Sequence, residues 1–301
     1  MLSIVPVLLL ATSAQGDDFS SASMLKSSFA TTFSRGDAAS SRGDAQPMKV
    51  ISAGQGRTGT ASLKSALARL GLKAYHMKDG AMETPGHMDL WLDYSEAELQ
   101  SPGSGGATLA KIVKKMAEDG FNATTDMPAC YIFEELLRQY PDARVVLSVR
   151  HTADAWASSV LGTIGRNLDI FGRVPFKWIP MMARVVSMNM WMWKTFGLSD
   201  DGFDARTRMP THTALVAGHD EWVERVKRSV PARKLLEDGY EPLCTFVSPV
   251  DAVIAAACQE VLSNNEPYPR KSLSRYMYMY AHTKPKKPTN LATNPIQSVE
   301  A

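Results

Sequence analysis

A glycine-rich segment with one cation, Gly54-Gln-Gly-Arg-Thr-Gly-Thr-Ala-Ser62, has the residue types needed to bind a phosphate-like anion. It follows a short apolar run, Lys49–Ala53, and leads into Ala61–Leu70, whose leucines recur on one face of a helix. In such a strand–loop–helix unit, the N–H groups of the loop and of the helix N-terminus face the bound anion. The pattern therefore predicts an anion cradle, although a tight turn without a ligand would favour the same glycines.

The loop differs from the ATP-binding consensus G-x-x-x-x-G-K-[ST] at the positions that carry its chemistry. Gly54 and Gly59 match the glycines, but Thr60 replaces the lysine and Ala61 replaces the hydroxyl that binds magnesium. Arg57 is the only cation in the loop. Because phosphoryl transfer relies on that lysine and on Mg²⁺, we expect a donor that needs no metal. A kinase or NTPase is disfavoured, and only magnesium-dependent ATP turnover would support one.

A second pair of polar residues follows another apolar run. Ala143–Val149 has the length and apolar character of a buried parallel strand, and Arg150 comes directly after it. Open α/β sheets bind ligands at the carboxyl ends of their strands. Ser158 lies two helical turns further on, in the helix-like stretch 152–160. We expect both side chains to reach a second phosphate; the alternative is an arginine paired with a surface carboxylate and an ordinary helix serine.

Several short sequence motifs accompany these two segments along the chain. They are Tyr75-His76-Met77, Thr125-Asp126-Met127-Pro128, Val149-Arg150-His151, the helix around His219 followed by Val230-Pro231, and Glu241-Pro242-Leu243-Cys244. Together with the loop, they make the chain resemble the sulfotransferases, most of all the branch that is common in microbes and algae. The resemblance runs from about Met48 to Arg270.

This resemblance implies an α/β fold of three layers, α/β/α, with a central parallel sheet, the P-loop nucleoside-triphosphate-hydrolase-like fold of sulfotransferases. It implies in-line, metal-independent transfer of a sulfuryl group from 3′-phosphoadenosine 5′-phosphosulfate (PAPS) to a hydroxyl of a small molecule, lipid or sugar. The 5′-phosphosulfate would lie in the loop, and the 3′-phosphate on Arg150 and Ser158. The implied donor-binding residues are Gly56, Arg57, Thr58, Gly59, Thr60, Ala61, Ser62, Arg150, Ser158 and Arg270.

Removal of the acceptor's proton needs a base, and two candidates end predicted strands at the same edge of the sheet. Asp126 ends Asn122–Asp126 just ahead of a proline, where cytosolic sulfotransferases carry their catalytic histidine, so the resemblance favours Asp126. Its pKa would have to be raised by burial for this role. His76 is the rival, since an imidazole has a pKa near neutrality. A helix cap at Asp126 and a packed imidazole at His76 are the structural alternatives. Arg57 would stabilise charge on the leaving phosphate.

Departures from the family pattern leave the activity open. Ala61 stands where relatives usually carry a second threonine, which removes one hydroxyl contact to the donor. A short strand that is usual between 231–236 and 237–240 is missing, and 247–265 is longer than usual. This C-terminal region, which includes Arg270, normally helps close the site over the nucleotide. The alternative function is therefore a sulfotransferase-like protein that binds nucleotide without turnover.

The composition argues against several other classes. With 301 residues, 45% of them hydrophobic and 21% charged, the chain suits one large globular domain. A net charge of +2 without a dense stripe of Lys and Arg gives no reason to expect nucleic acid as a partner. Three cysteines, Cys130, Cys244 and Cys258, cannot all pair and lack metal-ligand spacing. We expect no disulfide and no metal site, with each cysteine packed as a small apolar residue.

Apolar periodicity predicts the elements that would position these residues. Strands alternate with helices, which favours a parallel sheet covered by helices on both faces. The expected strands are 49–53, 72–76, 122–126 and 144–149, and the expected helices are 61–70, 108–119, 132–139, 153–161 and 211–230.

Composition also divides the chain along its length. Residues 1–16 resemble an imperfect signal peptide, and a Ser/Ala-rich leader, 17–47, is expected to be disordered. A signal suggests the secretory pathway or another organelle, with the cytoplasm as the alternative. The domain itself spans 48–275, in which the Met/Trp-rich segment 165–198 is a helical lid over the acceptor, a peripheral membrane contact or plain core. A disordered tail, 276–301, follows. The sequence does not reveal the oligomeric state.

Overall fold

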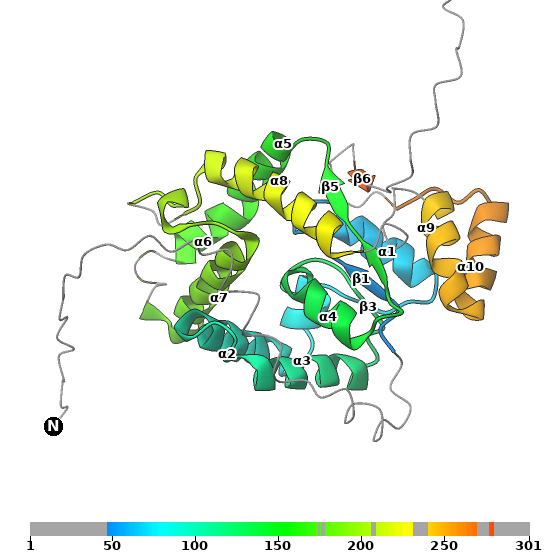
Figure 1. Cartoon of the computed structure of the whole chain (residues 1–301), viewed down its shortest axis with the longest axis horizontal. Coiled ribbons are helices and arrows are strands. Elements are labelled where there is room, and N and C mark those ends of the chain that lie inside the picture. The colour runs from blue at the N-terminus through cyan, green and yellow to red at the C-terminus, as the bar shows by residue number, and fades with distance from the viewer. Residues whose placement is uncertain are drawn as a thin grey trace, which may run out of the picture. The chain divides into compact units, whose positions relative to one another are not determined.

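Four short parallel strands form the sheet at the centre of the fold (Figure 1). The computed structural model describes residues 47–171, 173, 175, 178–205, 209–230, 240–269 and 277–279. The four strands are β1 (Val50–Ser52), β2 (Ala74–Tyr75), β3 (Ala123–Thr124) and β4 (Arg144–Val146), in the order β2-β3-β1-β4. The parallel α/β sheet expected from the sequence is confirmed, although each strand is shorter than predicted.

Successive side chains of each strand point to opposite faces of the sheet, and a separate hydrophobic core covers each face. In β1, Val50 belongs to one core and Ile51 to the other. In β4, which pairs with β1 in parallel, Val146 shares the core of Val50, and Val145 shares that of Ile51. Because both faces are buried, most strand residues are apolar. The polar residues Ser52 and Thr124 are buried as well.

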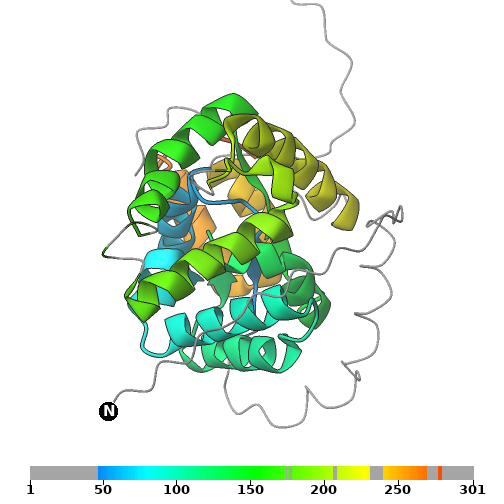
Figure 2. The same ribbon diagram turned by 90° about the vertical axis from the view of Figure 1, so that its left-hand side faces the viewer.

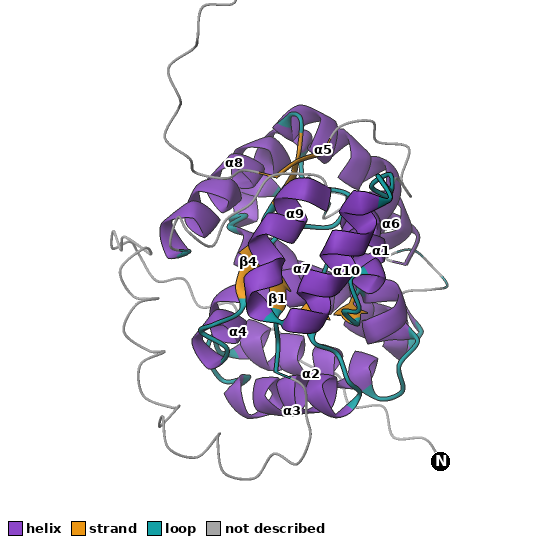
Figure 3. Cartoon of the chain, turned by 90° about the vertical axis from the view of Figure 1, so that its right-hand side faces the viewer, coloured by secondary structure: helices purple, strands orange, loops and turns teal. Residues whose placement is uncertain are grey.

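Helices complete a three-layer α/β/α arrangement, as expected. The core on the Val50 face is closed by α1 (Thr60–Arg69), α9 (Tyr240–Val247) and α10 (Ala252–Ser263), and Figure 3 shows α9 and α10 in front of β1 and β4. The other core is built from α2 (His87–Gln100), α3 (Gly106–Glu118), α4 (Phe133–Gln139), α5 (Ala153–Val160), α7 (Pro180–Phe196) and α8 (His212–Ser229).

The strand predicted over 144–149 is divided at Leu147, where the chain changes its pairing partner. β4 pairs with β1, whereas β5 (Ser148–Arg150) pairs in antiparallel fashion with β6 (Met277–Met279). β6 lies beyond the domain boundary expected at residue 275, within the segment predicted as a tail. Arg150 is the last residue of β5, at the end of a strand as predicted.

The predicted helices are confirmed to within two residues at each end, but α2 was not predicted. It lies in 80–106, which carries no clear apolar periodicity, and it buries Trp91 and Leu92. α7 belongs to the predicted lid segment with α6 (Arg166–Phe171), and it packs against α2 (Figure 2). An ion pair of 2.7 Å joins Arg184 on α7 to Glu96 on α2. Short helical turns complete the chain path: η2 (Met77–Met82), η3 (Ala129–Ile132), η4 (Leu161–Gly165), η6 (Asp200–Gly202) and η8 (Ser248–Val250).

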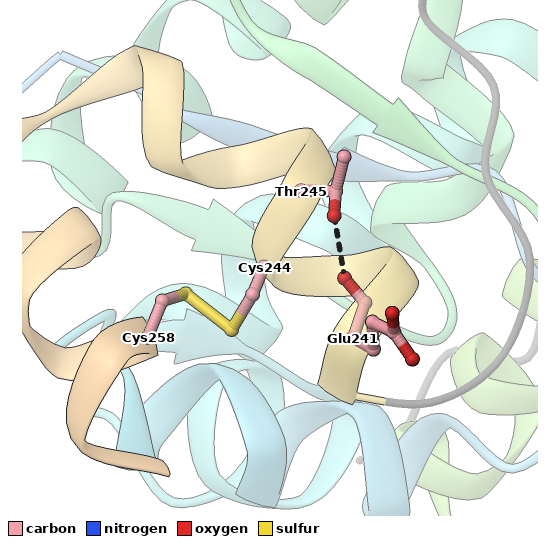
Figure 4. Close-up of a disulfide and its surroundings, with 4 residues drawn as sticks. All are labelled: Glu241, Cys244, Thr245 and Cys258. Atoms are coloured by element: carbon pink, nitrogen blue, oxygen red, sulfur yellow. Dashed lines mark hydrogen bonds between the residues drawn. A yellow bond between two sulfur atoms is a disulfide. The ribbon is translucent and has the colours of Figure 1, made fainter. Parts of the chain in front are cut away.

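One prediction about the cysteines is wrong. Cys244 on α9 and Cys258 on α10 form a disulfide, with their Cα atoms 5.4 Å apart (Figure 4). The two helices pack side by side, which brings together residues 14 positions apart in the sequence. Neither cysteine lies in a recognisable spacing motif, so the sequence did not indicate the pairing. Cys130 is the buried free cysteine, packed as an apolar residue as expected.

Several predictions fall outside the described residues. These are the signal peptide at 1–16, the leader up to residue 46, the junction near 236–237 where a strand is missing, Arg270, and the tail from 280 onward. No helix in the described ranges, α7 included, is long and apolar enough to cross a membrane.

Candidate active site

The glycine-rich loop folds into a tight turn between β1 and α1. The backbone N–H of Thr58 donates to the carbonyl of Gln55 at 3.3 Å, and the Thr58 hydroxyl donates to the same carbonyl at 2.6 Å. Arg57 has a φ of 73° and Gly59 a φ of 95°, so both adopt the left-handed conformation. Glycine does this freely, whereas for Arg57 it costs about 1–2 kcal/mol. α1 begins at Thr60, directly after Gly59.

Two glycines allow the loop to approach its neighbours closely. A Cβ at Gly54 would clash with the Ser148 hydroxyl and lie 2.9 Å from the Ser148 backbone nitrogen. The Ser148 hydroxyl is itself 2.8 Å from the Thr58 hydroxyl, which joins β5 to the turn. A Cβ at Gly56 would clash with Met127 and lie 3.2 Å from Oδ1 of Asp126. The glycine at 56 therefore leaves room for a carboxylate beside the turn.

Two buried tryptophans bind the loop from the helices behind it. The indole N–H of Trp156, on α5, donates to the carbonyl of Gly56 at 3.0 Å. The indole N–H of Trp222, on α8, donates to the carbonyl of Ala53 at 2.9 Å. The loop conformation therefore depends on helices far away in the sequence as well as on its own glycines.

Two arginines and one serine meet beside the turn. Arg150 Nη1 donates to the carbonyl of Arg57 at 2.9 Å and lies 3.3 Å from the Ser159 hydroxyl. Nε of Arg57 donates to the same hydroxyl at 3.1 Å. Burial, together with the positive charge of Arg57, lowers the pKa of Arg150 below its ordinary value. An anion placed beside both guanidinium groups would offset this repulsion.

Ser158, which was expected to share a phosphate with Arg150, contacts a different residue. Its hydroxyl lies 3.3 Å from Nε2 of His212, the first residue of α8, and this nitrogen lies 3.4 Å from Asp154. Its neighbour Ser159 is the serine that contacts Arg150. The donor-binding role of Ser158 stays a prediction.

The two candidate bases, which the sequence could not separate, form a pair at the ends of neighbouring strands. His76 follows β2 and Asp126 follows β3, and His76 Nε2 lies 3.3 Å from Asp126 Oδ2. The Thr60 hydroxyl lies 3.5 Å from the same imidazole nitrogen and also bonds Asp126. Asp126 is only 6% exposed and accepts from the backbone N–H groups of Met77 and Met127.

The hydrogen bonds of His76 determine which ring nitrogen carries the proton. Nδ1 accepts from the backbone N–H of Lys78 at 3.2 Å, so the neutral ring is protonated at Nε2 and donates to Asp126. Burial lowers the pKa of His76, and the charges of Lys64 and Lys78 act in the same direction. Burial raises the pKa of Asp126, opposed by His76. The carboxylate is thus a stronger base than one in water.

The structure brings together the predicted residues of the loop, Arg150 and the pair of His76 and Asp126. Arg150 ends β5, whereas the loop, His76 and Asp126 follow β1, β2 and β3 at the carboxyl ends of the parallel strands. This is the edge where open α/β sheets bind ligands. Sequence reasoning missed Ser159, Trp156 and Trp222. The tryptophans lie on the buried faces of helices, where an indole is ordinarily core, and their bonds to the loop join residues 100 and 169 positions apart.

A known protein family matches the part of the chain that holds the site. The sulfotransferase domain family matches residues 49–252, about two thirds of the chain, from β1 to the first residue of α10. The chain belongs to the sulfotransferase domain family. The match includes the loop, both candidate bases, Arg150 and both tryptophans. Family membership makes the protein a sulfotransferase-type transferase, and this family generally uses PAPS as its sulfate donor.

A curated relative of this sulfotransferase-domain protein is "Ava biosynthesis cluster protein M" of Aspergillus versicolor. The two are 33% identical over 214 residues, which cover 66% of this chain and 76% of the relative. The relative's name states neither a donor nor an acceptor.

Proposed function

We propose that the protein transfers a sulfuryl group from PAPS to a hydroxyl acceptor without a metal. One observation carries the proposal: the turn with Arg57, the arginine pair at Ser159, and the pair of His76 and Asp126 meet at one edge of the sheet. Sulfuryl transfer needs these three features, because it requires a cradle for the leaving phosphate, positive charge beside it, and a base for the acceptor.

In the proposed complex, the loop N–H groups and Arg57 bind the 5′-phosphosulfate, and Arg150 binds the 3′-phosphate. Ser158 and Arg270 are further predicted contacts to the donor. Electrostatics support this placement of the donor. The positive charge of Arg57 acts unfavourably on the guanidinium of Arg150, and a bound polyanion would neutralise the charges of both arginines. A planar guanidinium also matches the spread charge of a phosphate better than an ammonium does.

Asp126 is the proposed general base, and His76 positions it. Neutral His76 has no free lone pair, because Nδ1 accepts from Lys78 and Nε2 carries the proton given to Asp126. Oδ1 of Asp126 points toward Gly56 and the turn. The acceptor oxygen attacks sulfur while its proton passes to Asp126. The bond between sulfur and the phosphate oxygen breaks, and 3′-phosphoadenosine 5′-phosphate leaves.

Calorimetric titration of the full chain with 3′-phosphoadenosine 5′-phosphate tests the donor assignment, with ATP and Mg²⁺ as the control ligand. We expect the bisphosphate to bind, and Arg57→Ala and Arg150→Ala each to lose binding while staying folded. Arg138→Ala is the matched control, because Arg138 is an exposed arginine that pairs with Glu135 within α4. Unchanged affinity in both site variants would contradict the assignment.

The alternative is a sulfotransferase-like protein that binds nucleotide without turnover. It is motivated by Ala61, which lies in the first turn of α1 and supplies no hydroxyl beside the donor. Bisphosphate binding without sulfate transfer to any of a broad panel of hydroxyl acceptors would favour it. Magnesium-dependent ATP hydrolysis would instead point to an NTPase.

The segment 165–198 remains the proposed contact with an acceptor or a membrane surface. Four of the large apolar side chains exposed in the described residues lie there, namely Ile170, Trp178, Ile179 and Met181. Sedimentation with vesicles of phosphatidylcholine and phosphatidylserine tests the membrane contact. Ile170→Ser with Ile179→Ser should abolish cosedimentation, whereas Leu262→Ser, at an exposed leucine of α10, should not.

The disulfide supports the proposal that the chain enters an oxidising compartment. Such bonds persist in secreted proteins and are rare where thiols are kept reduced. The expected signal at 1–16 agrees with this route, and the cytoplasm is the alternative. Alkylation of protein taken from its native cells, with and without prior reduction, tests it. A Cys244 that is alkylated without reduction would contradict an oxidising compartment.

A further inference from the structure

The turn Gln55–Thr58 has a conformation that its sequence does not favour. Its closing hydrogen bond runs from the Thr58 N–H to the Gln55 carbonyl, and its third residue, Arg57, has a φ of 73°. A positive φ at the third position is the mark of a type II turn, in which glycine or asparagine is usual. The related type I turn would suit arginine there, and it differs mainly by a flip of the central peptide, between Gly56 and Arg57.

The carbonyl of that central peptide is the group that Trp156 binds. The Trp156 indole N–H donates to it at 3.0 Å, and the side chain is only 1% exposed. The indole is held in place by other rings, since its centroid lies 5.3 Å from that of Phe196 and 5.2 Å from that of His219. A fixed donor in a dry site favours the one peptide orientation that satisfies it.

Fixing this carbonyl also fixes the backbone N–H of Arg57. A trans peptide is planar, so its N–H and C=O point in opposite directions. With the Gly56 carbonyl directed at Trp156, the Arg57 N–H is directed away from α5, and the flipped peptide would reverse both. Arg57 is held at its other end as well, because its own carbonyl accepts from Arg150 at 2.9 Å.

We propose that Trp156 is a positioning residue whose indole N–H selects the type II turn and thereby aims the Arg57 N–H and side chain at the donor. The part of this inference that concerns the donor rests on the proposed function; the part that concerns the turn does not. Trp156 does not touch the reacting atoms in this scheme and acts only through the Gly56–Arg57 peptide.

The first measurement is amide hydrogen exchange of the full chain without nucleotide. Trp156→Phe removes the donor and keeps an aromatic ring, and we expect faster exchange at the Thr58 amide, whose bond closes the turn. Trp91→Phe is the matched control, because Trp91 is fully buried and its indole donates to the Tyr75 hydroxyl at 2.8 Å, away from the turn. Replacing the Trp156 indole by a benzothiophene of the same shape separates the lost donor from a cavity.

The second measurement is the affinity of each variant for 3′-phosphoadenosine 5′-phosphate. Loss of one buried hydrogen bond from the loop should weaken binding by roughly tenfold in Trp156→Phe. Trp91→Phe should bind like the unmodified protein, even if both variants unfold at similarly lowered urea concentrations. If Trp156 had a purely structural role, the two variants would not differ in affinity while being similar in stability.

The two measurements distinguish the effect of Trp156 on the turn from its effect on donor binding. Faster loop exchange and weaker binding in both Trp156 variants support the inference. Unchanged exchange at Thr58 in them, or equal losses in Trp91→Phe, would overturn it. If the unmodified protein fails to bind the bisphosphate while Trp156→Phe still loosens the turn, the donor assignment fails, and the selection of the type II turn by Trp156 stands.

Discussion

At the scale of single residues, substitution of Asp126 gives the most direct test of the proposed chemistry. Asp126→Asn keeps the shape and the bond from His76 but cannot accept a proton. We expect sulfate transfer to fall by roughly 10²–10⁴-fold, as for loss of a general base, with bisphosphate affinity unchanged. Steady-state kinetics and calorimetry measure the two. Asp119→Asn is the control, since Asp119 pairs with His87 in another part of the fold; similar activities of the two variants would exclude Asp126 as base.

The role of His76 predicts a change in pH dependence. Burial raises the pKa of Asp126 above the ordinary value of an aspartate, and His76 opposes this rise. Activity requires the carboxylate, so it is present above the pKa of Asp126 and is lost as the pH falls through it. His76→Phe removes the opposing group and keeps a ring in place, so the acidic limb of kcat should move to higher pH. A limb that stays in place, or moves to lower pH, would contradict a positioning role for His76.

Much of the site was predictable residue by residue, because each functional side chain follows an apolar run of strand length. The pairing of His76 with Asp126 was not predictable. It depends on β2 and β3 lying side by side, and strand order is not encoded in local pattern. The choice between Ser158 and Ser159 is a matter of helix rotation, and a shift of one residue turns a side chain by about a quarter turn or more.

At the scale of elements, the contact between the loop and β5 sets a limit on the side chain at residue 54. Gly54→Ala places a Cβ against the hydroxyl and the backbone nitrogen of Ser148, and the backbone cannot move aside without disturbing the strand. We expect a loss of about 1–3 kcal/mol in the free energy of unfolding, typical of overpacking, and weaker bisphosphate binding. Urea unfolding and calorimetry measure both. Gly106→Ala is the control, because a Cβ there meets no atom within 4 Å.

The disulfide joins two helices that cover one face of the sheet. Its cysteines are 14 residues apart, and closing such a loop restricts the unfolded chain by roughly 3 kcal/mol. Dithiothreitol should therefore lower the urea midpoint of the unmodified protein. The double variant Cys244→Ala with Cys258→Ala should have a low midpoint that dithiothreitol does not change. An equal response of both proteins to the reductant would show that the bond contributes nothing.

The elements that periodicity predicts are those whose neighbours are close in the sequence. The strand–loop–helix from β1 to α1 was placed correctly because its packing partner follows it directly. The break at Leu147 was not, since it arises where β5 leaves the partner of β4 and pairs with β6, more than a hundred residues later. α2 was missed because its buried residues, Trp91 among them, are interrupted by acidic ones.

At the scale of the whole molecule, buried imidazoles make the fold sensitive to acid. The pKa values of His76, His87 and His219 are lowered, with burial the largest cause in each case. In the unfolded chain they bind protons near the ordinary pKa of about 6.5. Below that pH the unfolded state binds more protons than the folded one. Their contribution to stability is therefore complete above pH ~6.5 and is lost as the pH falls below it.

Urea unfolding on either side of that pH measures this effect. The free energy of unfolding should fall with decreasing pH, and His87→Gln should make the fall shallower by removing one of the three groups. A stability that is constant from neutral to mildly acid pH would mean that these imidazoles titrate alike in both states.

The three-layer architecture was predictable as a whole, whereas the contacts between residues far apart in the sequence were not. Apolar strands that alternate with helices leave few arrangements other than a covered parallel sheet. The disulfide, the arginine pair and the indole bonds to the loop all join residues that only the finished fold brings together.

The bond from Trp222 to the Ala53 carbonyl spans 169 residues, and this has a consequence for how the protein is made. The ribosome releases the glycine-rich loop early and Trp222 late. The first part of the site to be synthesised is thus among the last to be completed. Until β3, β4 and the later helices emerge, the backbone edges of β1 stay unpaired and its apolar faces stay uncovered. Exposed strands of this kind are prone to aggregate, so a nascent chain that stalls before α8 should depend on chaperones far more than the released protein does.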